Sequence, residues 1–399
     1  MIKKAFPILA LSMFSSTLGI GIVMPLLPLY ISEMGASGIW LGVIVSSYAI
    51  SNSLTVPFAG RLSDIKGRKL FLAIGLLAYS LISLGYIFAT DVVMLALVRF
   101  VHGIAGAMII PVGIAYLGDL SPENEEGKWM GYANAAFFSG FGFGPLMGGL
   151  VTENFGMNTS FLVMAGLNMF SFIIVLLFLP NLRVREPGEE FNLSYREMSG
   201  SSIVRGLFSL RIAEALGRGG MFTFLPIFGV AIGLSISLIG VLISVNTLSI
   251  TLLSPVSGLI ADKLNRRFLA IIGMALFGLF IILLPATGSF WQVLLLLLGQ
   301  GLVVSIYISS SNALTVEEGR KFGMGSTMSV LFLGMGIGMG VGPILAGWIE
   351  GLLNVDAVFY NGGSICLVGT GLFIWFTRRY KEKKSYSKSE SELASVDSA

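Results

Sequence analysis

Twelve long apolar stretches follow one another along this chain, and they constrain its fold more than any other feature. A helix needs about 20 apolar residues to cross a hydrocarbon core of about 30 Å. The stretches cover 6–30, 40–60, 70–89, 93–117, 129–151, 159–179, 207–232, 237–259, 268–287, 291–314, 323–348 and 358–376. Only 12% of the residues are charged, against about 25% in soluble domains. We therefore predict an all-α integral membrane protein with twelve transmembrane helices, because lipid leaves backbone polar groups no other partners.

The basic residues give the orientation of these helices. All 25 Lys and Arg except Arg99, Arg211 and Arg218 fall in the two termini and in alternate loops. Basic loops stay on the cytoplasmic side of a membrane. We expect a multi-pass protein of the cell (cytoplasmic or inner) membrane with both termini in the cytoplasm.

The longest loop and the tail divide the chain into four parts. Residues 1–180 are expected to form an N-terminal six-helix bundle and residues 207–377 a C-terminal one. Residues 181–206, which mix both charges, are expected to form a cytoplasmic linker. Residues 378–399 become rich in Ser and acids, a composition typical of disorder.

The two predicted bundles carry similar residues at a constant offset of 198 positions. The pairs are Pro28 and Pro226, Gly60 and Gly258, Asp64 and Asp262, Arg68 and Arg266, Gly103 and Gly301, Gly144 and Gly342, Pro145 and Pro343, and Gly149 and Gly347. Membrane proteins built from such repeats place a substrate site near the midplane, between the copies, which rock about it. We therefore expect two pseudo-symmetric bundles.

Four motifs in this chain resemble those of the major facilitator superfamily. GRLSDIKGRK (60–69) is similar to its loop between helices two and three, and LVRFVHGIAG (97–106) to its helix-four motif. SGFGFGPLMGG (139–149) resembles its antiporter motif in helix five, and IVMPLLPLY (22–30) the first helix of twelve-helix drug:proton antiporters. The resemblance covers nearly the whole chain and implies a transporter rather than an enzyme.

The first of these motifs suggests a gating loop. Gly60 and Gly67 permit a tight reversal, while Asp64 and Arg68 can form an ion pair, which Asp262 and Arg266 repeat. The resemblance implies that Asp64 faces a helix N-terminus in the other half. The alternative is a turn that only fixes topology, and this explains the cations but not the repeated aspartate.

The helix-five motif places glycines on one helix face. Gly140, Gly144 and Gly148 recur every four residues, and Pro145 and Gly149 complete the antiporter-like set. Small residues allow close helix contact, and proline invites a bend. The resemblance associates this motif with exchange or export, and close packing alone is the other interpretation.

Ionisable residues inside membrane spans are costly and therefore suggest function. Arg99 and His102 lie three residues apart, and Glu214 and Arg218 four apart, so each pair shares a helix face. Gln300 takes the place of His102 in the repeat. We expect these five residues on a substrate or proton pathway, with Arg99, by resemblance, linked to proton coupling. A structural ion pair for Glu214 and plain packing for His102 remain the alternatives.

These features predict a proton-coupled exporter of small amphiphilic molecules that works by alternating access. The buried charges lean positive, so neutral or weakly anionic substrates are as well matched as cations. An uptake symporter or facilitator for a sugar or organic acid is the main alternative, and a receptor or enzyme that lost transport is another. We expect a monomer in the lipid bilayer that binds substrate and protons, with no metal, no cofactor and no nucleic acid.

Overall fold

The computed structural model describes residues 2–122, 126–180, 200–322 and 324–378, and in these ranges it contains helices and connecting turns. The helices of the first half are α1 (Ile2–Glu33), α2 (Gly38–Lys66), α3 (Arg68–Phe88), α4 (Val92–Ala107), α5 (Ile110–Leu120), α6 (Glu126–Phe155) and α7 (Met157–Phe178). Those of the second half are α9 (Ser202–Ala231), α10 (Ile236–Lys263), α11 (Arg266–Leu283), η1 (Leu284–Ala286), α12 (Phe290–Phe322), α13 (Met324–Leu352) and α14 (Val355–Thr377). Most of the predicted linker (181–199) and of the tail (379–399) lies outside the described residues.

The helices confirm the all-helical membrane fold and correct some predicted boundaries. In the described chain, 11 segments are long and apolar enough to span a membrane, with α4 and α5 counted together. The remaining one, α9, is 30 residues long but carries Arg211, Glu214 and Arg218 in its interior. The predicted span 93–117 is broken at Met108 and Ile109, where Pro111 near the start of α5 removes a backbone donor. Helix α9 also begins earlier than residue 207, at Ser202.

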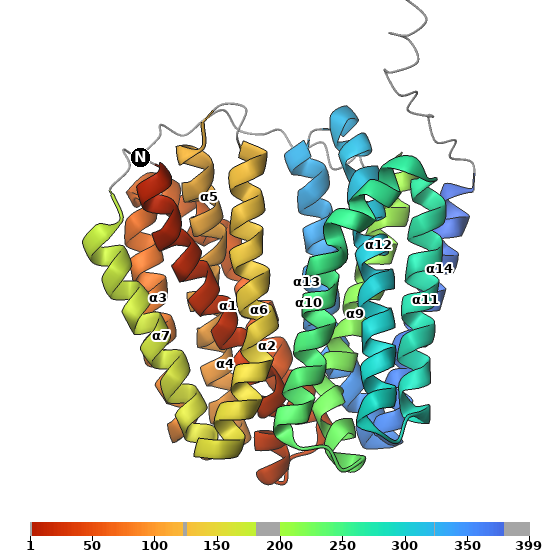
Figure 1. The fold of residues 1–399 in the computed structure, drawn as a ribbon, viewed down its shortest axis with the longest axis horizontal. Coiled ribbons are helices and arrows are strands. Elements are labelled where there is room, and N and C mark those ends of the chain that lie inside the picture. Colours follow the sequence, from red (N-terminus) through yellow and green to blue (C-terminus); the bar gives the residue numbers. More distant parts are fainter. Residues whose placement is uncertain (1, 123–125, 181–199, 323, 379–399) are drawn as a thin grey trace, which may run out of the picture.

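The helices form two groups, α1–α7 and α9–α14, that lie side by side (Figure 1). Their packing repeats. In the first group α1 contacts α6 and α7, and α2 contacts α4; in the second group α9 contacts α13 and α14, and α10 contacts α12. Across the groups α2 packs on α13 and α6 packs on α10.

The repeat holds for individual contacts. A β-carbon placed on Gly140 would meet Thr17 Oγ1 at 2.2 Å, and one placed on Gly338 would meet Ala215 Cβ at 2.5 Å. Each residue of the second pair follows its counterpart by 198 positions. The same offset relates the contact of Gly103 with Ser51 to that of Gly301 with Ser249. The two bundles are therefore pseudo-symmetric, as the sequence predicts.

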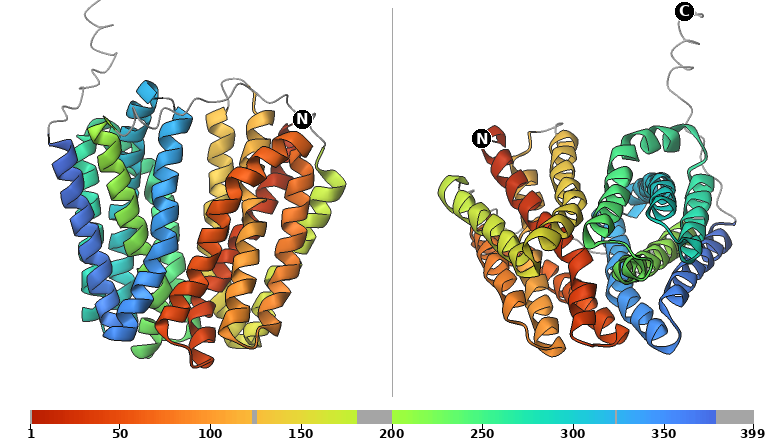
Figure 2. Two further views of the ribbon diagram at one scale, coloured as in Figure 1. Left: turned by 180° about the vertical axis from the view of Figure 1, so that it is seen from behind. Right: turned by 60° about the horizontal axis from the view of Figure 1, so that its bottom comes forward.

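The two groups are close at one end and apart at the other (Figures 1 and 2). We call the end with the start of α1 and the α2–α3 and α10–α11 connections the basic face, and the other end the opposite face. Towards the opposite face, a β-carbon on Gly42 would lie 2.2 Å from the Pro343 oxygen across the groups. At the basic face, β-carbons on Gly60 and Gly258 would have no atom within 4 Å. The opposite face is thus the sealed one.

Candidate functional site

Arg99 and His102 lie in a cluster of tyrosines inside the first group. Both side chains are buried on α4. Tyr86 Oη lies 2.8 Å from His102 Nδ1, and the Tyr79 ring centroid is 3.8 Å from that of His102. The Arg99 guanidinium lies 4.9 Å from the centre of the Tyr48 ring, a cation–π distance. Helices α2, α3 and α4 therefore hold Arg99 through rings rather than through a carboxylate.

Several nitrogens of this cluster have no hydrogen-bond partner. Within the described residues these are Nε and Nη1 of Arg99 and Nε2 of His102. No ion pair to Arg99 is present in the same part of the chain. A buried cation without a counter-ion is costly. The cluster can therefore favour an anionic group, or respond to a change of charge nearby.

Glu214 and Arg218 form an ion pair inside the second group. Arg218 Nε lies 2.5 Å from Glu214 Oε1, and the Glu214 side chain is 5% exposed against 19% for Arg218. The Arg218 guanidinium also lies 5.7 Å from the Phe277 ring centre. One turn earlier, Arg211 donates to Asn312 Oδ1 at 2.5 Å. The structure therefore shows Glu214 with Arg218 as its partner.

Gln300 is buried against α10. Asn246 Nδ2 donates to Gln300 Oε1 at 2.9 Å, and Gln300 Nε2 lies 3.1 Å from Met221 Sδ. Asn246 and Gln300 occupy the places of Tyr48 and His102 in the repeat, whose rings also touch, with centroids 5.8 Å apart. The contact is retained although its chemistry has changed from aromatic to amide.

These buried residues form three separate groups: Arg99 with His102, Glu214 with Arg218, and Gln300 with Asn246. In the described residues no hydrogen bond or ion pair joins one group to another. The first belongs to one half of the molecule and the other two to the second half.

The predicted gating loop is shorter than expected. Helix α2 continues to Lys66, so Gly60 lies within a helix and not in the turn. Gly67 makes the reversal with φ of 99°, a conformation that favours glycine. Asp64 Oδ1 lies 2.8 Å from Arg68 Nη1, and Arg68 also contacts Asp119 at the end of α5.

The same ion pair recurs in the second half. Arg266 Nη2 lies 3.3 Å from Asp262 Oδ1. Both aspartates are more than half exposed, at 52% for Asp64 and 68% for Asp262. Their described ion-pair partners belong to their own half, so the contact of Asp64 with the other half stays a prediction.

The antiporter-like motif of α6 contacts two other helices. β-Carbons on Gly140, Gly144 and Gly148 would clash with the backbone of α1, whose nearest atoms would lie 2.4 to 2.6 Å away. A β-carbon on Gly149 would lie 2.7 Å from the Ile236 oxygen of α10. The Pro145 oxygen would be 2.3 Å from a β-carbon on Gly240. The motif thus packs α6 on α1 within the half and on α10 across the halves.

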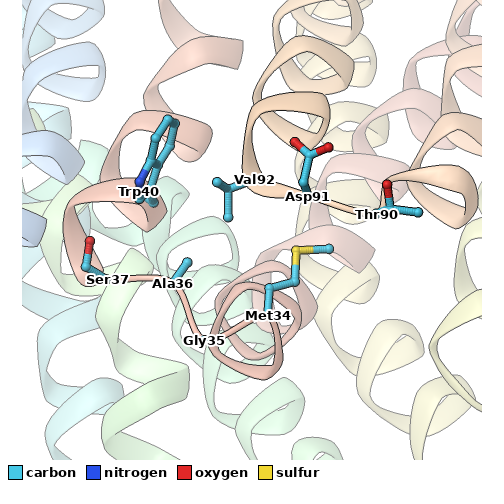
Figure 3. A pocket seen from close by; sticks show the side chains of 8 residues that line it. All are labelled: Met34, Gly35, Ala36, Ser37, Trp40, Thr90, Asp91 and Val92. Carbon is cyan, nitrogen blue, oxygen red and sulfur yellow. The ribbon is translucent and has the colours of Figure 1, made fainter.

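A cavity of about 460 Å³ lies at the opposite face, between the α1–α2 and α3–α4 connections (Figure 3). Met34, Trp40 and Asp91 are among its lining residues. Asp91 Oδ1 already accepts hydrogen bonds from the backbone nitrogens of Val93 and Met94, each at 2.9 Å. The cavity contains none of the predicted site residues.

The sequence analysis missed the tyrosines around Arg99 and the Asp119 contact of Arg68. Tyr79 and Tyr86 are seven residues apart, a spacing that places both on one face of α3. This spacing could have indicated a polar lining on an apolar helix. The spacing does not indicate which helix packs against these tyrosines.

The fold and these sites define a multi-pass membrane transporter with two repeated halves. The chain belongs to the major facilitator superfamily, whose family model matches residues 9–211 and 207–398. The family and the relatives below are transporters and not enzymes.

Relatives in sequence match this chain over different shares of its length. The chain is 25% identical to an uncharacterized MFS-type transporter of Methanocaldococcus jannaschii over 93% of this chain and 97% of the relative. It is 27% identical to multidrug resistance protein 2 of Bacillus subtilis, over 96% of both chains. It is 34% identical to the quinolone resistance protein NorA of Staphylococcus aureus, but only over 38% of this chain and 39% of NorA.

Solved structures share the fold. A bacterial homolog of the human lysosomal transporter Spinster, in an inward-facing and occupied conformation, has a TM-score of 0.80 at 14% identity, covering 95% of this chain and 98% of the homolog. The nucleoside transporter NupG has a TM-score of 0.76 at 16% identity, covering 94% of this chain and 100% of NupG. At these identities the likeness concerns the fold alone.

Proposed function

We propose that this protein is a proton-coupled exporter of small amphiphilic molecules and works by alternating access. The observation that carries the mechanism is the two-fold repetition of the contacts between the halves. Gly42 meets Pro343 in α13 as Gly240 meets Pro145 in α6. These contacts belong to two equivalent seams between the halves, α2 on α13 and α10 on α6, which seal the opposite face. Such equivalent seams allow the halves to rock as units.

In this mechanism the two helix groups are the moving domains. The basic face is the cytoplasmic side, because it bears the cationic loops. The described conformation is then open to the cytoplasm and closed to the outside. Substrate enters between the halves, which rock to close the basic face and open the opposite one. Asp64 then contacts the second half.

Export is supported by the antiporter-like motif in α6 and by the names of two relatives. Multidrug resistance protein 2 matches over nearly the whole chain, and NorA over part of it. Membrane proton gradients can drive such export without a nucleotide. Arg99, His102, Glu214, Arg218 and Gln300 are proposed to line the pathway of substrate and protons.

The charges inside the membrane favour substrates that are neutral or weakly anionic. Arg99 has no carboxylate partner in the described residues, while Glu214 is already paired with Arg218. A cationic substrate would therefore meet an interior with a positive excess. Purified protein should be stabilised more in a thermal-shift screen by neutral and anionic amphiphiles than by permanent cations. Binding of permanent cations only, unimproved by Arg218→Ala, would contradict this substrate class.

Inverted membrane vesicles test the direction and the coupling. With the interior acidified, an exporter that exchanges substrate for protons should accumulate substrate inside, and a protonophore should abolish the accumulation. Vesicles containing Asp64→Asn protein at equal abundance serve as the control. Equilibration of substrate without accumulation, whatever the gradient, would favour a facilitator, and accumulation only with the opposite gradient would favour an uptake symporter.

A further inference from the structure

Two carboxylates connect the halves at the opposite face. Glu153, near the end of α6, accepts a hydrogen bond from the backbone nitrogen of Ser237 at 3.0 Å. Ser237 lies in the first turn of α10, in the other half. Glu350, near the end of α13, lies against the first residue of α2, since a β-carbon on Gly38 would be 2.0 Å from Glu350 Oε2. Each half thus presents a carboxylate to a helix N-terminus of the other.

The repeat relates these two contacts. Gly149 faces the Ile236 oxygen, and Gly347 faces the Gly38 oxygen. The 198-residue offset relates Gly149 to Gly347 and Gly38 to Ile236. The glutamates follow these glycines by four and three residues, so they differ from strict equivalence by one position. The two contacts therefore belong to the two equivalent seams.

A carboxylate is stabilised at a helix N-terminus because the free backbone N–H groups carry partial positive charge. A hydrogen bond to a charged acceptor is also roughly twice as strong as a neutral one. Protonation removes both effects. The contact of Glu153 with the first turn of α10 should therefore be strongest when Glu153 is ionised.

In the described residues of the opposite face, no Lys, Arg or His side chain is available to pair with these carboxylates. In the described segments of the opposite face the ionisable side chains are acids and phenols: Tyr30, Glu33, Asp91, Glu153, Glu350, Asp356 and Tyr360. Asp91 caps α4 in its own half, and Tyr30 donates to the carbonyl oxygens of Tyr86 and Ala89, also in its own half. Glu153 and Glu350, by contrast, lie against a helix of the other half.

We infer that Glu153 and Glu350 form a proton-sensitive clasp that holds the opposite face closed. Glu153 takes up one proton from the medium on that side, and the neutral side chain releases the N-terminus of α10. The opposite face then opens. In the proposed exporter, whose opposite face meets the outside, external acid would promote the outward-open state. That last step rests on the proposed function, whereas the clasp itself does not.

The experiment measures opening directly and uses no substrate. Spin labels are placed on cysteines introduced at Asn158 and Ser289, two exposed positions in different halves, with Cys366→Ser as background. Distances are recorded in nanodiscs by electron double resonance between pH 7.5 and pH 4.5. Acid should raise the population with the longer distance.

Substitutions separate the clasp from general effects of charge. At pH 7.5, Glu153→Gln and Glu350→Gln should each raise the ratio of open to closed molecules about two- to fivefold, as loss of a carboxylate at a helix N-terminus predicts. The double variant should respond to acid far less than the parent. Glu33→Gln, an exposed acid on the same face, is the matched control and should leave the ratio unchanged.

A second variant keeps the charge and removes the donor. Ser237→Pro deletes the N–H that Glu153 accepts, at a first-turn position where proline is tolerated. It should open the face like Glu153→Gln. Distances that neither acid nor these variants change would overturn the clasp, as would an equal response to Glu33→Gln. Because no transport is measured, such a result would leave the exporter proposal standing, and failure of vesicle transport would leave the clasp standing.

Discussion

Gly42 in α2 packs so closely on Pro343 in α13 that a β-carbon at position 42 would lie 2.2 Å from the Pro343 carbonyl oxygen. The repeat places Gly240 against the Pro145 oxygen at 2.3 Å in the same way. Both contacts are backbone to backbone and join the two halves. The seal of the opposite face therefore depends on the absence of side chains at two related positions.

Gly42→Ala and Gly240→Ala should destabilise the described conformation. The added methyl group meets backbone atoms that cannot rotate away, and overpacking of this kind costs about 1–3 kcal/mol. Spin-label distances across the opposite face should shift to longer values, and transport should slow. Gly166→Ala in α7, with no atom within 4 Å of the added carbon, is the control. An unchanged distance in both seam variants would show that the seal does not require these glycines.

Arg218→Ala should be far more damaging than removal of Arg266, whose partner Asp262 is exposed. It leaves Glu214 buried without its cation, and such a loss costs about 3–5 kcal/mol. Arg266→Ala breaks an ion pair with the same spacing but with an exposed aspartate, which is worth less than about 1 kcal/mol. Thermal unfolding of the purified variants measures both. Equal losses would contradict the assignment of a buried pair, and Glu214→Gln combined with Arg218→Gln should recover part of the stability.

Tyr86→Phe should destabilise the first half without changing its shape. His102 Nδ1 loses its hydrogen-bond partner while the ring stays buried, and an unsatisfied buried group costs about 1–3 kcal/mol. Tyr360→Phe, at an exposed tyrosine, should have no effect on the unfolding temperature. A Tyr86→Phe protein as stable as the parent would mean that the hydroxyl does not support His102.

Asp64→Asn should leave folding and membrane insertion intact and strongly reduce turnover. In the described conformation the carboxylate is half exposed and pairs with Arg68, so its loss costs at most about 1 kcal/mol. Its proposed role belongs to the conformation in which the basic face is closed. Abundance in the membrane and initial transport rate are the measurements. A normal rate would leave Asp64 only a topological role.

The sequence predicts the membrane spans and the repeated halves of this protein well, for physical reasons. Hydrophobic length determines the spans. The 198-residue offset relates Gly140 to Gly338 and also relates their neighbours, Thr17 in α1 and Ala215 in α9. The break between α4 and α5 was missed because both sides of Pro111 are apolar, so hydropathy does not register it. Hydropathy predicts that helix α9 begins at residue 207, where the apolar stretch begins. The helix begins earlier, at Ser202.

The candidate site was less predictable. Spacing within a helix correctly paired Glu214 with Arg218 and Asp64 with Arg68, because those contacts are local. The neighbours of Arg99 come from α2 and α3, and Glu153 meets a helix in the other half. Such contacts depend on how helices pack, which the period of one segment does not determine.

Proton movement driven by a substrate gradient tests the central claim most directly. Purified protein is placed in liposomes with a trapped pH dye, and an amphiphile that stabilises it in the thermal-shift screen is added outside. Exchange predicts that substrate entry drives protons out, so the interior becomes alkaline, and that the Asp64→Asn protein gives a much smaller change. An interior that becomes acidic, or substrate entry with no change in pH, would contradict proton-coupled export.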